Sequence, residues 1–348
     1  MVRVPVVLDC GGSAIKYGYA NDERPSVVPL TDDATTLERR GDAIDWESLE
    51  ALWRELPIRL HGQHVVLVQP FNSTPADCGH MTRILFESFH VAGLYIGHPA
   101  VLMAASTAAA AATSKQGDAF SGVVVDVGDG GANTVAVSEG CVIRSSARRL
   151  HVGGRDLTQR MAQMLVEAGS LPVPLGPAAG NNIAIAKDIK EQYGYVSLDY
   201  DNDLDKSAVS TLFDLPYTLP DGRVVNIGSE RFRCPEMLFS HNIHAMAYES
   251  SMALLSPQAP TGSTFLISGG SSLFLNFSCR LRNELKALAS AKNTSEDVTV
   301  VAPRDRKDLA WIGGAQLSSK AETDLWVTDK DYVDAGSGVV YRKFASVF

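Results

Sequence analysis

The sequence lacks the features that mark nucleic-acid-binding and membrane-spanning proteins. Its 348 residues hold 31 Lys and Arg against 40 Asp and Glu, for a formal net charge of -9. Because domains that bind DNA or RNA usually present a basic face, this balance disfavours direct nucleic-acid binding. The alanine-rich stretch 101–112 is too short and too polar at its edges to span a bilayer, and the first ten residues, MVRVPVVLDC, show no secretory pattern. We therefore expect a cytoplasmic protein without membrane contact.

Clustered metal ligands and common catalytic motifs are also missing. The eight histidines show no HExxH spacing, and Ser271 and Ser272 lack a GxSxG elbow, so metallopeptidase and esterase chemistry have no footing. The cysteines form no CxxC pair or Cys/His cluster, and a chain of this size needs no disulfides. We expect reduced structural thiols at all five positions: Cys10, Cys78, Cys141, Cys234 and Cys279.

What is present indicates an α/β protein with a substantial core. Apolar residues make up 45% of the chain and charged residues 20%, and the length suggests about two domains. The polar segment 114–121 is the best candidate for a crossing between them. Strands are predicted near residues 4–8, 65–68, 94–96, 123–125, 134–137 and 265–267, and helices near 45–53, 74–89, 99–112, 155–168, 182–192 and 276–289.

An internal repeat is the most informative feature. Residues 6–20 read VVLDCGGSAIKYGYA and residues 123–137 read VVVDVGDGGANTVAV, each a β-forming run that ends in an acid, a glycine-rich turn and a second strand. Either string alone is typical of a plain β-turn. As a pair, the turns can cradle phosphate oxygens with backbone N–H groups, and Asp9 and Asp126 can hold a hydrated Mg²⁺. The repeat therefore predicts a nucleoside-triphosphate clamp.

At these hairpins, and in later segments, the sequence resembles the actin family. The similar strings include FSGVVVDVGDGGANTVAVSEG, ARRLHVGGRDLTQRM, YTLPDGRVVNIGSERFRCPEMLF, LISGGSSLFLNFSCRLRNEL and VVAPRDRKDLAWIGGAQLSS, in order along nearly the whole chain. The resemblance implies two duplicated ribonuclease-H-like domains around a nucleotide cleft. The first would comprise residues 1–113 and 310–348, and the second residues 114–309, with a helical subdomain at about 155–235.

The resemblance also implies a set of residues that bind ATP or ADP with Mg²⁺. Asp9 and Asp126 would hold the metal through water. Without the resemblance, the pair Lys190 and Glu191 would be read as a solvated helix face, and Gly269-Gly270 as a strand-to-helix turn. The phosphate residues would be Gly11, Gly12, Ser13, Lys16, Asp126, Gly128, Asp129 and Gly130, and the adenosine residues Gly154, Arg155, Asp156, Lys190, Glu191, Gly269, Gly270, Ser271 and Lys307.

Departures from the family pattern bear on catalysis. Pro99 aligns with the glutamine that positions the attacking water in actins, and proline has no side-chain donor or acceptor. Asn133 stands where actins carry a histidine, and Gly12 where they carry a serine that contacts the γ-phosphate. His98 is the alternative base, one residue from the lost glutamine. We expect no significant ATP hydrolysis.

Two segments that carry filament contacts in actins are also reduced. Between Pro29 and Asp45 only LTDDATTLERRGDAI remains of a small subdomain, and after Phe239 the chain reads SHNIHAMAYES without the apolar loop. The groove near Trp326 and Tyr341, which partners use in actins, is the expected docking site. The resemblance implies a non-filamentous, actin-related subunit or adaptor in a larger cytoskeletal, motor-associated or chromatin assembly, in the cytoplasm, an axoneme or the nucleus. Alternatives are a polymerising actin-like ATPase and a sugar-kinase-type phosphotransferase, for which no segment supplies the catalytic carboxylate.

Overall fold

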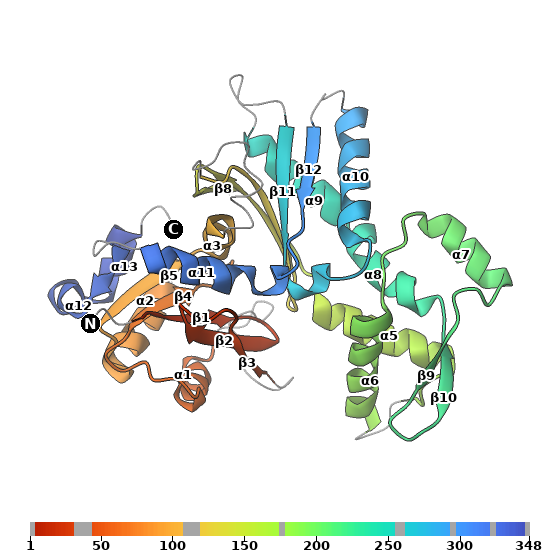
Figure 1. The fold of residues 1–348 in the computed structure, drawn as a ribbon, viewed down its shortest axis with the longest axis horizontal. Helices are drawn as coiled ribbons and strands as arrows, with labels where there is room; N and C mark the ends of the chain where they lie inside the picture. Colours follow the sequence, from red (N-terminus) through yellow and green to blue (C-terminus); the bar gives the residue numbers. More distant parts are fainter. Residues whose placement is uncertain are drawn as a thin grey trace.

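The computed structural model describes residues 4–30, 44–106, 119–173, 178–254, 262–292, 297–320 and 325–344. Two mixed β-sheets, each with flanking helices, form its framework, and a two-stranded hairpin lies apart from them (Figure 1). The predicted α/β class is therefore confirmed.

The first sheet has six strands in the order β13-β5-β4-β1-β2-β3. Its strands come from both ends of the described chain, so the residues near the C-terminus return to the N-terminal half. The strand bounds are β1 Val6–Cys10, β2 Ala14–Tyr19, β3 Ser26–Pro29, β4 His64–Val68, β5 Gly93–Gly97 and β13 Val327–Thr328.

The second sheet has five strands in the order β12-β11-β6-β7-β8, and β9 and β10 form the separate hairpin. Residues of β6 alternate between two faces: Val123 and Val125 belong to the core beneath this sheet, whereas Val124 belongs to the core around the first sheet. The strand bounds are β6 Gly122–Val127, β7 Ala132–Ser138, β8 Cys141–Leu150, β9 Leu215–Thr218, β10 Val224–Ile227, β11 Gly262–Ser268 and β12 Asp297–Val301.

Five strands of the first sheet repeat the topology of the second. Strand β1 pairs antiparallel with β2 and parallel with β4, while β6 pairs antiparallel with β7 and parallel with β11. The outer pairs correspond as well, because β2–β3 and β7–β8 are antiparallel and β4–β5 and β11–β12 are parallel. This duplication confirms the expected pair of related domains, and it places the two glycine-rich turns at equivalent ends of the sheets.

Helix starts follow local capping chemistry. Asp45 accepts a hydrogen bond from the Ser48 backbone N–H at 3.1 Å, as predicted for an N-cap, and Thr74 forms a capping box with Asp77. The helices on the side of the first sheet are α1 Trp46–Glu55, α2 Pro75–Arg83, which continues as the short π-helix η1 Ile84–Ser88, α3 Pro99–Ala105, α11 Leu309–Lys320, α12 Asp329–Ala335 and α13 Val339–Lys343, with 3₁₀ turns η4 Arg306–Asp308 and η6 Gly336–Gly338.

On the side of the second sheet, α5 and α6 pack together and α8 lies against both (Figure 1). Helix α10 lies beside β12, and α9 covers β7 and β8. The bounds are α5 Gly154–Glu167, α6 Ala178–Tyr193, α7 Tyr200–Val209, α8 Glu230–Ser240, α9 Ile243–Ser251 and α10 Phe277–Ala291, with 3₁₀ turns η2 Met252–Leu254 and η3 Gly270–Ser272.

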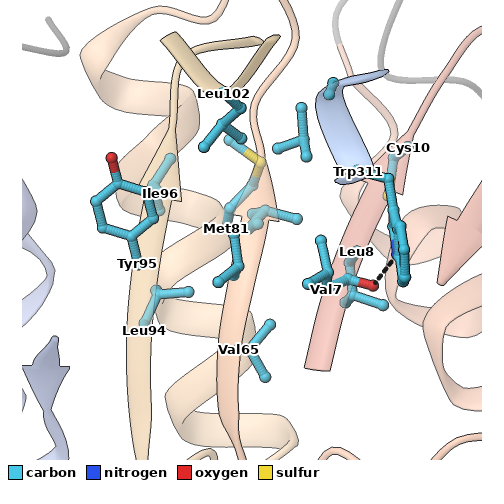
Figure 2. Packing of buried hydrophobic residues seen from close by; sticks show 14 of the residues in the cluster. Val7, Leu8, Cys10, Val65, Met81, Leu94, Tyr95, Ile96, Leu102 and Trp311 are labelled. Atoms are coloured by element: carbon cyan, nitrogen blue, oxygen red, sulfur yellow. Dashed lines mark hydrogen bonds between the residues drawn. The ribbon is translucent and has the colours of Figure 1, made fainter. Parts of the chain in front are cut away.

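Helices α3 and α11 are in unusually close contact. A Cβ built on Gly313 of α11 would lie 1.7 Å from the Leu102 carbonyl oxygen of α3, so only glycine fits there. Close by, the buried Trp311 donates from Nε1 to the Val7 carbonyl at 3.2 Å, which ties α11 to β1 (Figure 2). The same core contains Leu8, Met81 and other apolar side chains of the first sheet and its helices. These contacts fix α11 on the first sheet.

Several sequence predictions fall at or beyond the limits of the described residues. Residues 31–43 lie outside the described part of the chain, and they include most of the shortened segment after Pro29. Residues 107–118 also lie outside it. They include the expected helix end at 112, the domain boundary at 113–114 and most of the crossing at 114–121. The second boundary, at 309–310, falls at the first residue of α11. At the other reduced filament contact, α8 ends at Ser240 and α9 begins at Ile243, so no long loop separates them.

Candidate functional site

A cavity of about 610 Å³ is lined by the turns of both equivalent hairpins. Most residues predicted for phosphate, metal and adenosine also line it, although they come from distant parts of the sequence. They are Asp9, Gly11, Gly12, Ser13, Lys16, Asp126, Gly128, Asp129, Lys190, Glu191, Gly269, Gly270, Ser271 and Lys307. Gly130, Gly154, Arg155 and Asp156 are not among the residues that line the cavity. The ligand roles of all these residues stay predictions.

The first hairpin brings a lysine between carboxylates. Asp9 on β1 lies opposite Lys16 on β2, and the turn between them closes with the Gly11 N–H donating to the Ala14 carbonyl at 3.0 Å. Lys16 Nζ lies 3.5 Å from an oxygen of Asp9 and 3.5 Å from an oxygen of Asp308, and it donates to the Lys307 carbonyl. Burial acts to lower the pKa of Lys16, but the carboxylates outweigh it and raise that pKa, so the ammonium is charged at neutral pH.

The second hairpin holds an acid in an unfavourable environment. Asp126 on β6 lies opposite Asn133 on β7, as Asp9 lies opposite Lys16 in the first hairpin. Burial raises the pKa of Asp126 from 3.8 to about 6, against the opposing effects of Ser268 and Lys16, and nearby Asp9 raises it further. An ionised Asp126 is therefore under-compensated, and a cation at this place would relieve it.

The carboxylates of the two hairpins fit a hydrated Mg²⁺. Asp9 and Asp126 both line the cavity and are close enough for the charge of one to raise the pKa of the other. Among the described residues, no three His, Cys, Asp or Glu side chains are grouped to hold a metal by themselves. A small hard cation usually keeps several waters and binds one or two carboxylates plus ligand phosphates, which matches this donor set.

Arg155 joins the two hairpins from the start of α5. Its Nη2 donates to Asp129 in the second hairpin and to the Gly12 carbonyl in the first, both at 3.3 Å. The backbone before it is crowded, because a Cβ on Gly153 would lie 2.4 Å from the Asp129 carbonyl oxygen. Asp156 accepts from the Gly153 N–H at 2.9 Å and so caps α5. Arg155 and Asp156 therefore hold the two hairpins and the start of α5 together without lining the cavity.

Lys190 is buried, not part of a solvated helix face. Its side chain is 6% exposed and Nζ donates to the Gly154 carbonyl at 3.0 Å and to the Thr158 hydroxyl at 2.9 Å. Burial lowers the pKa of Lys190, partly offset by Glu191. Glu191, which was predicted, and Lys187, which was not, are both exposed where they line the cavity. Lys190 thus ties α6 to the N-terminal turn of α5 while it lines the cavity.

The glycines that follow β11 are held against the second hairpin. Gly269 has a φ of +87°, and a Cβ there would lie 2.2 Å from the Val127 carbonyl oxygen, so the position requires glycine. The Ser271 hydroxyl donates to the Gly128 carbonyl at 3.0 Å. The strand-to-helix turn considered for Gly269-Gly270 is present as the 3₁₀ turn η3, and it also forms a wall of the cavity.

The surroundings of Pro99 include a buried histidine, His98, and a glutamine, Gln69. Pro99 lines the cavity as the first residue of α3, and His98 caps this helix by accepting at Nδ1 from the Ala100 N–H at 3.2 Å. Burial lowers the pKa of His98 to about 4, which makes its neutral ring a weak base. Gln69, at the end of the neighbouring strand β4, also lines the cavity, and its Oε1 accepts from the Cys78 thiol at 3.2 Å.

Asp308 is a further cavity residue that was not predicted as part of the site. It is 7% exposed and precedes the first residue of α11. Its carboxylate became apparent only from the fold, because Lys16 lies 292 positions earlier in the sequence and the pair forms where η4 meets the first hairpin. The run RDRKD by itself is typical of a solvated charged turn.

The C-terminal segment is built into the first half. Trp326 is 7% exposed, and its ring meets His64 edge-on with centroids 4.9 Å apart. The Tyr341 hydroxyl donates to the Pro75 carbonyl at 2.6 Å. Because the indole of Trp326 is buried, a partner at this place would contact the side chains that surround it more than the indole itself.

Comparison with known families extends over nearly all of the chain. The sequence model described as Actin matches residues 33–177 and 179–345. The first hairpin precedes the matched residues, so its assignment rests on the duplicated topology and on the lysine and acid that face the cavity. None of the helices in the described part of the chain is long and apolar enough to cross a membrane.

Proposed function

The chain belongs to the actin family, and we propose that it is a non-filamentous actin-related subunit that binds ATP or ADP with Mg²⁺ as a structural cofactor. The observation that carries nucleotide binding is the cavity lined by both glycine-rich hairpins, with Asp9, Lys16 and Asp126 directed into one place. Fold membership alone does not define activity, so the proposal rests on these side chains.

Each part of the cavity has a role in this proposal. Backbone N–H groups of the two turns surround the phosphates, and Lys16 supplies a point charge to the terminal phosphates. Asp9 and Asp126 would hold the hydrated cation, which when bound would supply positive charge that offsets the charge of the phosphates. The adenosine occupies the side formed by Glu191, Lys190 and the glycines after β11, with Leu273 and Phe274 as its apolar surface.

The absence of turnover is also part of the proposal. Pro99 supports it because it offers no group that can orient a water, and His98 supports it because burial favours the neutral ring and makes it a weak base. A nucleotide held without hydrolysis stabilises the folded chain by mass action and keeps its two halves in one arrangement. The protein then acts as a fixed component of an assembly.

The role as a subunit or adaptor rests on the reduced polymer contacts. The direct passage from α8 to α9 supports it, because a filament needs interfaces large enough to offset the entropy lost on association. We expect partner proteins of a cytoskeletal, motor-associated or chromatin assembly to dock near the groove around Trp326. We expect the cytoplasm as its location, with an axoneme and the nucleus as alternatives.

A polymerising, hydrolysing actin is the second candidate, and Gln69 is the observation that favours it. Gln69 lines the same cavity as Pro99, which stands at the position of the water-positioning glutamine of actins. Gln69 Oε1 accepts from the Cys78 thiol, which fixes the orientation of the amide and leaves one of the two lone pairs of the oxygen for a water. Release of phosphate that is lost in Gln69→Leu would favour this candidate.

The test begins with the purified full chain. Denaturing it and analysing the released small molecules shows whether it retains a nucleotide, and melting with and without Mg-ATP shows whether the ligand stabilises it. Retention or a clear rise in melting temperature supports the proposal. A protein that holds no nucleotide and gains no stability from Mg-ATP refutes it. Affinity purification from the native source, followed by mass spectrometry, identifies the assembly.

A further inference from the structure

Besides the two carboxylates assigned to the metal, the cavity contains Asp308, whose carboxylate is directed at the lysine expected to bind phosphate. Asp308 Oδ1 lies 3.5 Å from Lys16 Nζ, the same distance that separates Lys16 from Asp9. The side chains are largely enclosed, with exposed fractions of 20% for Lys16 and 10% for Asp308. Attraction between charges is stronger in such a place than at an exposed surface, because water screens it less.

The Asp308 carboxylate depends on this contact. Its Oδ1 is buried and accepts no hydrogen bond from the described part of the chain, although it lies within ion-pair distance of Lys16. A buried carboxylate oxygen that accepts no hydrogen bond is costly unless a cation lies next to it. The N-terminus of α11, which begins at the next residue, adds a favourable partial charge. Lys16 is thus the principal counter-charge of Asp308.

We propose that Asp308 is an internal competitor of the phosphate chain: its carboxylate pairs with Lys16 and thereby sets a weak affinity of the cavity for nucleotide polyphosphates. The inference rests on the proposed nucleotide site. A phosphate group that approaches Lys16 must share the ammonium with Asp9 and Asp308, and it meets the negative charge of both. The acid therefore tunes binding in proportion to the charge of the ligand.

The alternative role for Asp308 is to help hold the cation. The two roles predict opposite changes in nucleotide affinity when the carboxylate of Asp308 is removed. If Asp308 competes with phosphate, Asp308→Asn binds nucleotide more tightly, because the amide keeps the shape and removes the charge. If Asp308 assists the cation, the same variant binds Mg-nucleotide more weakly. Asp305→Asn is the matched control, since Asp305 is three residues away, its side chain is 58% exposed and it pairs with Arg24 at the surface.

The experiment measures binding of AMP, ADP and ATP to the full-length protein by calorimetry in the presence of Mg²⁺. We expect Asp308→Asn to bind ATP about tenfold more tightly, equivalent to about 1.4 kcal/mol. We expect a smaller gain for ADP, almost none for AMP, and less gain at high salt. Asp305→Asn should bind all three as the unmodified chain does. In a Lys16→Gln background, the gain from Asp308→Asn should shrink.

The outcomes separate this inference from the proposed function. Equal or weaker ATP binding by Asp308→Asn, with the unmodified chain binding normally, overturns the inference and leaves the nucleotide site intact. A gain of equal size for AMP and ATP, or one that persists in Lys16→Gln, also overturns it. Binding by Asp308→Asn alone supports the inference and refutes the proposed function, because the cavity then takes nucleotide only when Asp308 is neutralised and the natural chain is held empty. If neither protein binds any of the ligands, the inference and the proposed function are both wrong.

Discussion

Replacing Asp126 with asparagine should have opposite effects on the empty protein and on its complex with Mg-nucleotide. In the empty protein, burial raises the pKa of Asp126 from 3.8 to about 6. At neutral pH the carboxylate is ionised in a place that disfavours its charge. A shift of about two units corresponds to at most about 3 kcal/mol of unfolding free energy. Because Asp126→Asn removes this penalty, the empty variant should be more stable than the natural chain.

The pH dependence of this difference follows from the direction of the shift. Since the folded-state pKa lies above the unfolded value, the native state binds the extra proton between about pH 4 and pH 6. The penalty is therefore absent near pH 4, grows as the pH rises, and is complete above about pH 7. At pH 7, and at about 2 °C per kcal/mol for a chain of this size, the variant should melt about 5 °C higher.

Ligand addition should reverse the order. A nucleotide at a thousand times its dissociation constant stabilises a binding protein by about 4.1 kcal/mol, which exceeds the gain of at most about 3 kcal/mol in the empty variant. Asp126→Asn should lose this gain, because an amide cannot supply the negative charge that the cation requires. The assay is thermal melting of nucleotide-stripped protein from pH 4 to pH 8, with and without Mg-ADP.

Asp129→Asn serves as the control for this assay. It removes a carboxylate that pairs with Arg155 at 3.3 Å in the same hairpin, so it should lower stability at neutral pH. The reasoning is refuted if empty Asp126→Asn melts at or below the natural chain at pH 7, or if their difference does not change with pH.

Three further expectations concern turnover, assembly and packing. Release of phosphate from ATP should stay at the background rate and be unchanged in His98→Ala; a clear rate that disappears in this variant would show that His98 is a base. Sedimentation at salt and Mg-ATP concentrations that polymerise actins should show a monomer, and long regular polymers would contradict the adaptor role. Gly313→Ala should destabilise the chain by about 1–3 kcal/mol, because its methyl group would overlap the Leu102 carbonyl. Gly270→Ala, with no heavy atom within 4 Å of its Cβ, is the control, and equal melting temperatures would refute this explanation.

The two hairpins could be predicted because their signal is local. In each, a run of three apolar β-forming residues is followed by an acid and a glycine-rich turn, and the structure places β1–β2 and β6–β7 there. The start of α1 was predictable for the same reason, since Asp45 caps it through a bond to a residue three positions away. Short-range chemistry of this kind can be read directly from the chain.

Features that depend on distant segments were harder to find. Lys190 has the sequence context of an exposed helix face, yet it is buried because α5 packs on α6 and supplies the carbonyl and hydroxyl that accept from it. Gln69 reaches the cavity because β4 and β5 end side by side. Asp308 reaches it because η4 returns to the first hairpin. Nothing near these residues in the sequence marks them, so only the assembled fold reveals them.

The close contact of α3 and α11 has a mechanical consequence. The chain leaves the first sheet for the second after α3 and returns to it just before α11, and both helices begin at the cavity with Pro99 and with Asp308 next to Leu309. Because the backbones meet at Gly313 without space for a methyl group, the two helices cannot slide past each other. We therefore expect any rotation of one sheet relative to the other to occur about these two passages, and a ligand that draws the hairpins together to bring the two sheets closer.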